Sequence, residues 1–267
     1  MIDLIIDGHV HIEEKATVRP PFTVESLIQH MDEKPNLLGR RIDYALVQGP
    51  TPRDPKGFDY EKQHEYLLQS TGKYPDRLFA MMFINPLMDV DKALLVLDKL
   101  VGRGVKAVKL HPRISVFRPD SNAKQIAPIL EKCSKLKLHV HIHSGDPFCE
   151  PSRIEPLAES FTDVPIVICH FGSQMISYAV DAIGVAKRRK NILLEANSYP
   201  MERLKEGVKS VGPAQFIFGS DCPINDIWSW ANMIEVLKKP APLGVGLSEQ
   251  ETEMILSGNM ARLLGVH

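Results

Sequence analysis

The stretch Leu4-Ile5-Ile6-Asp7-Gly8-His9-Val10-His11 is an apolar run that ends in two histidines separated by one residue. Side chains alternate between the two faces of a β-strand, so His9 and His11 share a face, about 6.5–7 Å apart. Neutral imidazole is a common ligand of zinc, at about 2.0–2.1 Å. The stretch therefore predicts a first strand that ends either in a metal-binding pair or in two polar residues at the start of a loop. Matching ligands on later strands would favour the metal site.

Length, composition and charge limit the class of protein. The chain has 267 residues, 44% hydrophobic and 24% charged, and 32 basic against 33 acidic residues give a net charge of −1. The length fits one α/β barrel of about 250 residues, and the balanced charge argues against nucleic-acid or membrane partners. No signal peptide and no long apolar run is present, so we expect a cytoplasmic protein. The four cysteines form no C-x-x-C pair, and we expect reduced thiols.

Short β-branched runs alternate with segments of helical periodicity along the chain. The expected strands are residues 4–11, 43–48, 78–84, 105–111, 138–144, 165–170, 191–196 and 215–221. Helical segments follow at residues 23–28, 60–70, 91–101, 123–136, 151–160, 175–189, 201–210, 228–237 and 248–264. Eight strands, each followed by a helix, close a parallel barrel, whereas an open doubly wound sheet usually has about five to seven strands. We therefore predict an α/β fold, a single (β/α)8 TIM-barrel domain over residues 1–267 with an additional C-terminal helix.

Ionisable residues gather where these strands end, which is where barrel enzymes place their chemistry. They are His9, His11, Lys109, His111, His143, His170 and Asp221. Because each strand is apolar until its last few residues, this distribution favours a metal site. Strand parity places Lys109 one layer below His111. In the fifth strand it places His143 at the mouth, His141 buried below it with a hydrogen-bonding neighbour, and His139 near the floor.

Two further histidines, His30 and His64, lie in helical segments, and we expect both on the surface. The arginines after the strands are the candidates for holding a substrate carboxylate, since guanidinium binds carboxylates bidentately. Arg53 follows the second strand, Arg113 and Arg118 follow the fourth, and Arg153 follows the fifth. Solvated surface arginines are the alternative. We select Arg113 and Arg53 as the substrate-binding candidates.

Six short motifs in order resemble the signature of the amidohydrolase superfamily. They are Asp7-Gly8-His9-Val10-His11, Lys109-Leu110-His111-Pro112, His141-Ile142-His143-Ser144-Gly145, Cys169-His170-Phe171-Gly172, Phe218-Gly219-Ser220-Asp221-Cys222-Pro223 and Gly258-Asn259-Met260-Ala261-Arg262-Leu263-Leu264. Within the superfamily the chain resembles the amidohydrolase-related ("amidohydrolase 2") metal-dependent hydrolases, which include non-oxidative decarboxylases. The match runs from the first strand to the last helix. We expect no small β-sandwich subdomain of the kind found in the superfamily, because the first predicted strand begins at residue 4.

The resemblance implies one divalent metal, Zn²⁺ in the first place with Mn²⁺ as the alternative. The implied ligands are His9, His11, His143 and Asp221. Asp221 and His170 are the implied catalytic residues. Lys109 lies near the place where some members carry a carboxylated lysine between two metals, and we expect instead an unmodified amine that binds substrate or packs in the barrel. Lys109, His111 and His170 are thus the candidates for a second metal or for substrate contact.

Three hypotheses about function remain. In the first, a metal-activated water attacks a C–O or C–N bond of a small carboxylated substrate. The second is a metal-dependent decarboxylase or hydratase, a lyase with the same ligands. The third is a barrel that binds a metal or ligand without turnover, which is disfavoured because structural zinc sites are closed and usually rich in cysteine. The expected partner is a small molecule, and a homodimer is compatible with the sequence.

Overall fold

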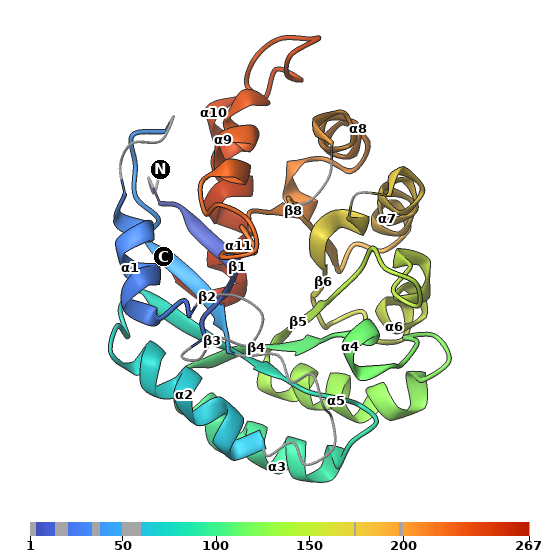
Figure 1. The fold of residues 1–267 in the computed structure, drawn as a ribbon. Helices are drawn as coiled ribbons and strands as arrows, with labels where there is room; N and C mark the ends of the chain where they lie inside the picture. Colours follow the sequence, from blue (N-terminus) through green and yellow to red (C-terminus); the bar gives the residue numbers. More distant parts are fainter. Residues whose placement is uncertain are drawn as a thin grey trace.

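The computed structural model describes residues 4–13, 21–33, 38–49, 60–173, 175–197 and 200–266. Within these residues, eight parallel strands form one sheet in the order β1 to β8, with helices around it (Figure 1). The strands are β1 (Ile6–His11), β2 (Tyr44–Gln48), β3 (Leu78–Phe83), β4 (Val105–Leu110), β5 (His139–Ile142), β6 (Ile166–Ile168), β7 (Ile192–Glu195) and β8 (Phe216–Ile217). The predicted (β/α)8 barrel is confirmed.

The barrel closes through hydrogen bonds between the first strand and the segment that contains and follows the last one. The amide of Gly8 donates to the carbonyl of Phe218 at 2.9 Å, and the amide of His11 donates to the carbonyl of Cys222 at 2.7 Å. A Cβ on Gly8 would lie 2.9 Å from that Phe218 oxygen, so only glycine allows this close approach. The Asp7-Gly8-His9 sequence therefore places the first histidine at the seam of the barrel.

Helices follow the strands and form the outer layer (Figure 1). They are α1 (Val24–Asp32), α2 (Tyr60–Gly72), α3 (Val90–Val101), α4 (Pro112–Ser115), α5 (Ala123–Leu136), α6 (Glu155–Ser160), α7 (Ile176–Arg188), α8 (Met201–Val211), α9 (Ser229–Val236), α10 (Glu249–Glu253) and α11 (Asn259–Leu264). Thr23 caps α1 by accepting the amide of Ser26, and Ser248 with Glu251 forms a capping box on α10. A π-helical segment, Met254–Gly258, joins α10 to α11, so the additional C-terminal helix is confirmed.

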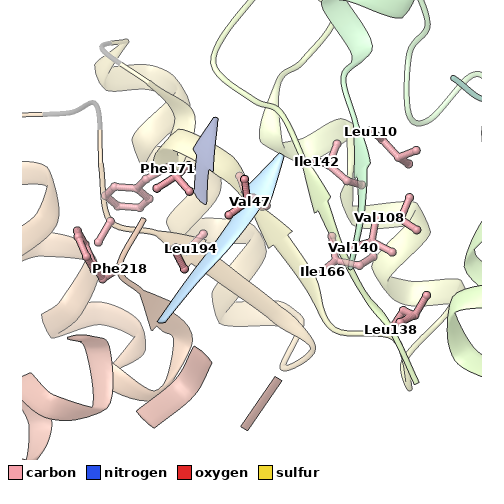
Figure 2. Packing of buried hydrophobic residues seen from close by; sticks show 14 of the residues in the cluster. Val47, Val108, Leu110, Leu138, Val140, Ile142, Ile166, Phe171, Leu194 and Phe218 are labelled. Carbon is pink, nitrogen blue, oxygen red and sulfur yellow. The ribbon is translucent and has the colours of Figure 1, made fainter. Parts of the chain in front are cut away.

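Strand alternation divides the buried side chains into two clusters. The larger cluster lies between the sheet and the helices, and Figure 2 shows part of it, including Val140 and Ile142 of β5. The smaller cluster, inside the barrel, includes Ile6, Ala107 and Leu193 from the first halves of their strands, together with Met260 of α11. The C-terminal helix thus covers the N-terminal end of the barrel. The opposite end is left for loops and polar side chains.

Several boundaries differ from the sequence-based expectation. Three strands end two or more residues earlier than predicted, so His143, His170 and Asp221 lie beyond β5, β6 and β8. The reason is local: β6 runs directly into a 3-10 turn at Cys169–Gly172, and β8 is only two residues long before the chain turns back to β1. The proline at position 128 does not end α5, which continues to Leu136.

The prediction that His64 lies on the surface is wrong. Its side chain is buried in α2, where Nε2 accepts the backbone N–H of Phe83 at the end of β3. His30 is half-buried, with Nδ1 donating to the carbonyl of Ser26 in α1. The helical periodicity located both residues correctly. The periodicity could not show that His64, rather than His30, would accept a hydrogen bond from the end of β3.

Candidate functional site

The chain takes up strained backbone conformations where β6 and β8 meet the mouth of the barrel. His170, Phe171 and Asp221 have φ of 61°, 47° and 61°, in the left-handed region that costs residues with a Cβ about 1–3 kcal/mol each. Neighbouring segments hold these conformations. The Ser144 hydroxyl donates to the carbonyl of Cys169 at 2.6 Å, and the Asp221 amide donates to the carbonyl of His9 at 2.8 Å. Two of the predicted catalytic residues are therefore fixed by the fold in positions that they would not adopt in an isolated peptide.

Asp221 lies at the centre of a cluster of imidazoles. Its Oδ1 is 3.1 Å from His11 Nε2 and 3.9 Å from His9 Nε2, and its Oδ2 is 3.9 Å from His170 Nδ1. His9, His170 and Asp221 each offer a ligand atom within 4.8 Å of the other two, and all three are buried. Four predicted site residues from β1 and from the ends of β6 and β8 thus meet in space.

The charge states in this cluster suit a divalent cation. Burial, together with the nearby Lys109 amine, lowers the pKa of His9 well below its ordinary value, so its imidazole is neutral at pH 7. Burial opposes ionisation of Asp221, but the neighbouring His170 and the hydrogen bond from His11 outweigh it and hold its pKa well below the ordinary value. Neutral imidazole nitrogens and an ionised carboxylate are the donors that Zn²⁺ and similar ions bind. The residues present therefore fit a divalent metal.

His143 lies beside the cluster but directs Nε2 elsewhere. That nitrogen is 2.8 Å from Asp146 Oδ2, and the ring stacks on His111 with centroids 3.8 Å apart. Its centroid is 4.8 Å from that of His170. Burial lowers the pKa of His143 to about 4, although the hydrogen bond to Asp146 acts in the opposite direction. The structure therefore brings His143 next to the other predicted ligands while its Nε2 is engaged by Asp146, a residue that the sequence analysis did not single out.

Lys109 and His111 occupy different layers, as the strand parity predicts. Lys109 is buried inside the barrel, with Nζ 3.1 Å from both His9 Nε2 and Cys169 Sγ. His111 is half-buried at the N-terminus of α4, where its Nδ1 accepts the amide of Ile114 at 3.4 Å. Burial lowers the pKa of His111 well below its ordinary value. Lys109 therefore contacts one candidate metal ligand, His9, and His111 caps a short helix at the mouth.

Two buried polar residues at the end of β7 were missed by the sequence analysis. Glu195 contacts His9 Nδ1 through both carboxylate oxygens, at 3.0 and 3.1 Å. Asn197 Oδ1 lies 3.0 Å from His170 Nδ1. The signal was present, because Glu195 is the ionisable last residue of an otherwise apolar strand, Ile192–Glu195. The rule that identified the other strand ends applies to it equally.

The arginines expected near the mouth are in different environments. Arg113 is exposed, with its guanidinium 2.8 Å from Asp146, and Arg153 is paired with Glu150 and Asp120. Arg118 is also exposed and lies over the ring of Phe148, 4.7 Å from its centroid. Among the described residues no salt bridge involves Arg118. Arg53, the other predicted substrate-binding arginine, lies outside the described residues.

His139 provides a test of acid stability away from the mouth. It is buried on the inner face of β5, and neither ring nitrogen has a hydrogen-bond partner among the described residues. Burial lowers its pKa from 6.5 to about 3. Below pH 6.5 the unfolded chain therefore binds a proton that the folded chain excludes, so stability falls as the pH falls towards 3, by about 1.4 kcal/mol per pH unit.

Replacing this histidine should reduce that dependence. For His139→Leu we expect the slope of unfolding free energy against pH, between pH 6 and 4, to be smaller than in wild type by up to about 1.4 kcal/mol per unit. Urea unfolding at several pH values measures it. A slope equal to that of wild type would show that His139 carries no such proton linkage.

The arrangement defines a class of protein: a parallel α/β barrel with a histidine–carboxylate site at the C-terminal ends of its strands, as in barrel enzymes. The chain belongs to the amidohydrolase family, whose model matches residues 6–266. This match confirms the resemblance. No curated protein sequence matches the chain. Among the described residues, no helix has the length and apolar character needed to cross a membrane.

Solved structures with the same fold cover almost the whole chain at low sequence identity. A probable 2-pyrone-4,6-dicarboxylic acid hydrolase from Acinetobacter baumannii, with citric acid bound, is 18% identical with a TM-score of 0.69, over 98% of this chain and 99% of that one. A 5-carboxyvanillate decarboxylase from Sphingomonas paucimobilis is 14% identical with a TM-score of 0.67, over 99% of both chains. A dihydroxybenzoic acid decarboxylase from Polaromonas sp. JS666, with manganese and 2-nitroresorcinol bound, is 14% identical with a TM-score of 0.71, over 99% of this chain and 97% of that one.

Proposed function

We propose that this chain is a metal-dependent hydrolase that cleaves a C–O or C–N bond of a small carboxylated substrate. The observation that carries the proposal is the buried Asp221 carboxylate, ionised and surrounded by His9, His11 and His170 at the barrel mouth. A carboxylate in this position can both bind a cation and accept a proton. The site lies at the strand ends where barrel enzymes bind their substrates.

The proposed metal ligands are the residues implied by the family motifs. They are His9, His11, His143 and Asp221. A divalent cation bound there supplies Lewis acidity, polarising an oxygen and lowering the pKa of water from about 15.7 towards about 7. Zinc is our first choice and manganese the second. The manganese bound to the Polaromonas decarboxylase supports the second choice.

The protein's own residues handle the protons. Asp221 accepts the proton of the attacking water and passes it to the leaving group, because its lowered pKa keeps it ionised before attack. His170, buried beside Asp221, hydrogen-bonds the oxygen on which negative charge develops or acts as a base. General acid–base assistance of this kind contributes about 10²–10⁴-fold to the rate.

The substrate carboxylate is proposed to bind at the arginines of the mouth. Arg113 was selected from the sequence, but its guanidinium is already 2.8 Å from Asp146. Arg118, held over Phe148, offers a cation beside an aromatic face. Arg53 remains a candidate outside the described residues. The citric acid bound to the Acinetobacter hydrolase supports a carboxylated ligand.

Decarboxylation is the second candidate, supported by the decarboxylases among the structural neighbours. The substrate's own carboxylate would then leave as CO₂, and His170 or Asp221 would deliver a proton to the carbon. The ligand set is the same for both reactions. The products distinguish them, because hydrolysis consumes water and yields an acid with an alcohol or amine.

A substrate panel tests the proposal. Purified protein loaded with Zn²⁺ or Mn²⁺ is incubated with lactones, esters and amides of small di- and tricarboxylic acids, and with hydroxybenzoic acids. We expect acid release from the first group without CO₂. CO₂ release from the aromatic acids would establish the second candidate instead. If wild type and Asp221→Asn are equally inert on the whole panel, the barrel that binds without turnover is favoured.

A further inference from the structure

The end of β7 carries two buried polar side chains for which the proposed chemistry has no role. Glu195 and Asn197 are both fully buried. The Glu195 carboxylate faces His9 Nδ1, at 3.0 and 3.1 Å from its two oxygens. A buried carboxylate is costly unless it is hydrogen-bonded, and the protonated nitrogen of an imidazole is a suitable donor.

A second contact of His9 specifies the same proton position. Lys109 Nζ lies 3.1 Å from His9 Nε2. An ammonium group has three donors and no acceptor, so the nitrogen facing it must carry a lone pair. The proton of the neutral ring is then on Nδ1, where it donates to Glu195. Two independent neighbours therefore select one tautomer of His9.

Asn197 imposes the same tautomer on His170. Its amide nitrogen donates to the carbonyl of Gly219 at 2.8 Å and to a carboxylate oxygen of Glu195, and both of these groups only accept. The amide cannot be flipped without losing both bonds. Its oxygen therefore faces His170 Nδ1, 3.0 Å away, and that nitrogen must donate.

The backbone leaves little room for another arrangement. A Cβ on Gly219 would lie 3.0 Å from Glu195 Cγ and 3.1 Å from His9 Cβ, so a side chain there would crowd the carboxylate and the imidazole. The same residue accepts the Asn197 amide through its carbonyl. Gly219 lies in the segment between β8 and Asp221. The β7 pair is thus tied directly to the segment that carries the catalytic carboxylate.

An alternative role for this cluster is a metal site of its own, because His9, Cys169 and Glu195 also offer ligand atoms within 4.8 Å of one another. The Cys169 sulfur opposes it, since Sγ already accepts a hydrogen bond from Lys109 Nζ at 3.1 Å, as the sulfur of a protonated thiol can. The contacts fit a hydrogen-bonding network better than a second metal site.

We propose that Glu195 and Asn197 are positioning residues, which hold His9 and His170 with the proton on Nδ1 and the lone pair on Nε2. The inference rests on the proposed function for the roles of the two histidines. The Nε2 lone pair of His9, which faces Lys109 in this structure, is the one that would bind a cation. The Nε2 lone pair of His170 makes this residue a base rather than a hydrogen-bond donor to the developing oxyanion. Hydrogen bonds from the far nitrogen of a metal-binding imidazole fix its orientation and raise its basicity, and losing one typically weakens metal binding about 10–100-fold.

The first experiment measures metal affinity. Glu195→Gln keeps the shape of the side chain and removes its charge, and we expect Zn²⁺ and Mn²⁺ to bind about 10–100-fold more weakly in competition with a chelator. The control is Gln215→Leu. Gln215 is a buried amide outside the histidine cluster, and its nitrogen donates to the backbone carbonyls of Ala186, Arg189 and Ile192. This control should lower the thermal unfolding temperature and leave metal affinity within about twofold. Metal affinity of Glu195→Gln within twofold of wild type would overturn the role of Glu195.

The second experiment reads the tautomers without metal or substrate. Protein labelled with ¹⁵N-histidine gives separate NMR patterns for Nδ1–H and Nε2–H rings, assigned with His9→Asn and His170→Asn. In wild type we expect both rings in the Nδ1–H form, and in Asn197→Leu we expect a substantial Nε2–H population for His170 alone. An Nε2–H ring at either position in wild type would overturn the inference. If wild type binds no metal, the proposed function fails, while this experiment still decides the inference.

Discussion

Asp221→Asn is expected to lower kcat/KM by about 10²–10⁴-fold on whichever substrate the panel identifies. The amide keeps the size of the side chain but cannot accept the proton of the attacking water. It also removes the negative charge that His11 and His170 surround at 3.1 and 3.9 Å. Steady-state kinetics at saturating metal measures the loss, with metal content determined on the same samples.

A control for this substitution lies five residues further along the chain. Asp226 is exposed, and its Oδ1 accepts the amide of Trp228 near the start of α9. Asp226→Asn makes the same chemical change outside the cluster and should leave kcat/KM within about twofold of wild type. Retention of more than about a tenth of wild-type activity by Asp221→Asn would exclude the role assigned to the carboxylate.

Gly172→Ala is expected to destabilise the fold by more than about 4 kcal/mol, among the largest effects of single substitutions. Gly172 has φ of +81°, and an added Cβ would lie 2.4–2.7 Å from backbone atoms of Tyr178 and Ala179 in α7. Backbone atoms cannot rotate away as a flexible side chain can, so α7 or the turn that holds His170 must move. Urea unfolding measures the change, and low yield of folded protein is the extreme form of the same result.

Gly212→Ala is the control that measures the cost of a positive φ without a steric clash. It has φ of +82°, but an added Cβ would meet nothing within 4 Å. Gly212→Ala should therefore cost only about 1–3 kcal/mol, the penalty of a backbone conformation (φ 82°, ψ 162°) that is essentially confined to glycine. If Gly172→Ala and Gly212→Ala lower the free energy of unfolding equally, the predicted clash with α7 does not contribute to the destabilisation.

The strand pattern in the sequence was sufficient to predict the barrel and to select residues that meet in space. His9, His11, His170 and Asp221 were identified because each follows an apolar strand, and parallel strands place their ends at one edge. Parity also placed Lys109 and His141 within the barrel, and both are buried there. These features depend on local periodicity and on the symmetry of the fold, which a single sequence carries.

Other features depend on contacts between distant segments. The direction of His143 Nε2 is set by Asp146, after a turn at Gly145 with φ of +97°. The residues Ser144-Gly145-Asp146-Pro147 are typical of a turn, but they do not show that the Asp146 carboxylate meets His143. The burial of His64 depends on the end of β3, nineteen residues further along the chain. Glu195 was overlooked although its position at a strand end follows the same rule as the others. Its contact with His9 spans 186 residues.

The most direct test of the central claim is the location of a bound ion. Crystals of the protein loaded with Zn²⁺ would be measured at the zinc absorption edge. We predict one anomalous peak at the barrel mouth, about 2.0–2.2 Å from a nitrogen of His9 and an oxygen of Asp221. A peak between Cys169 and Glu195 with Asp221 unbound, or no peak at the mouth, would contradict the account.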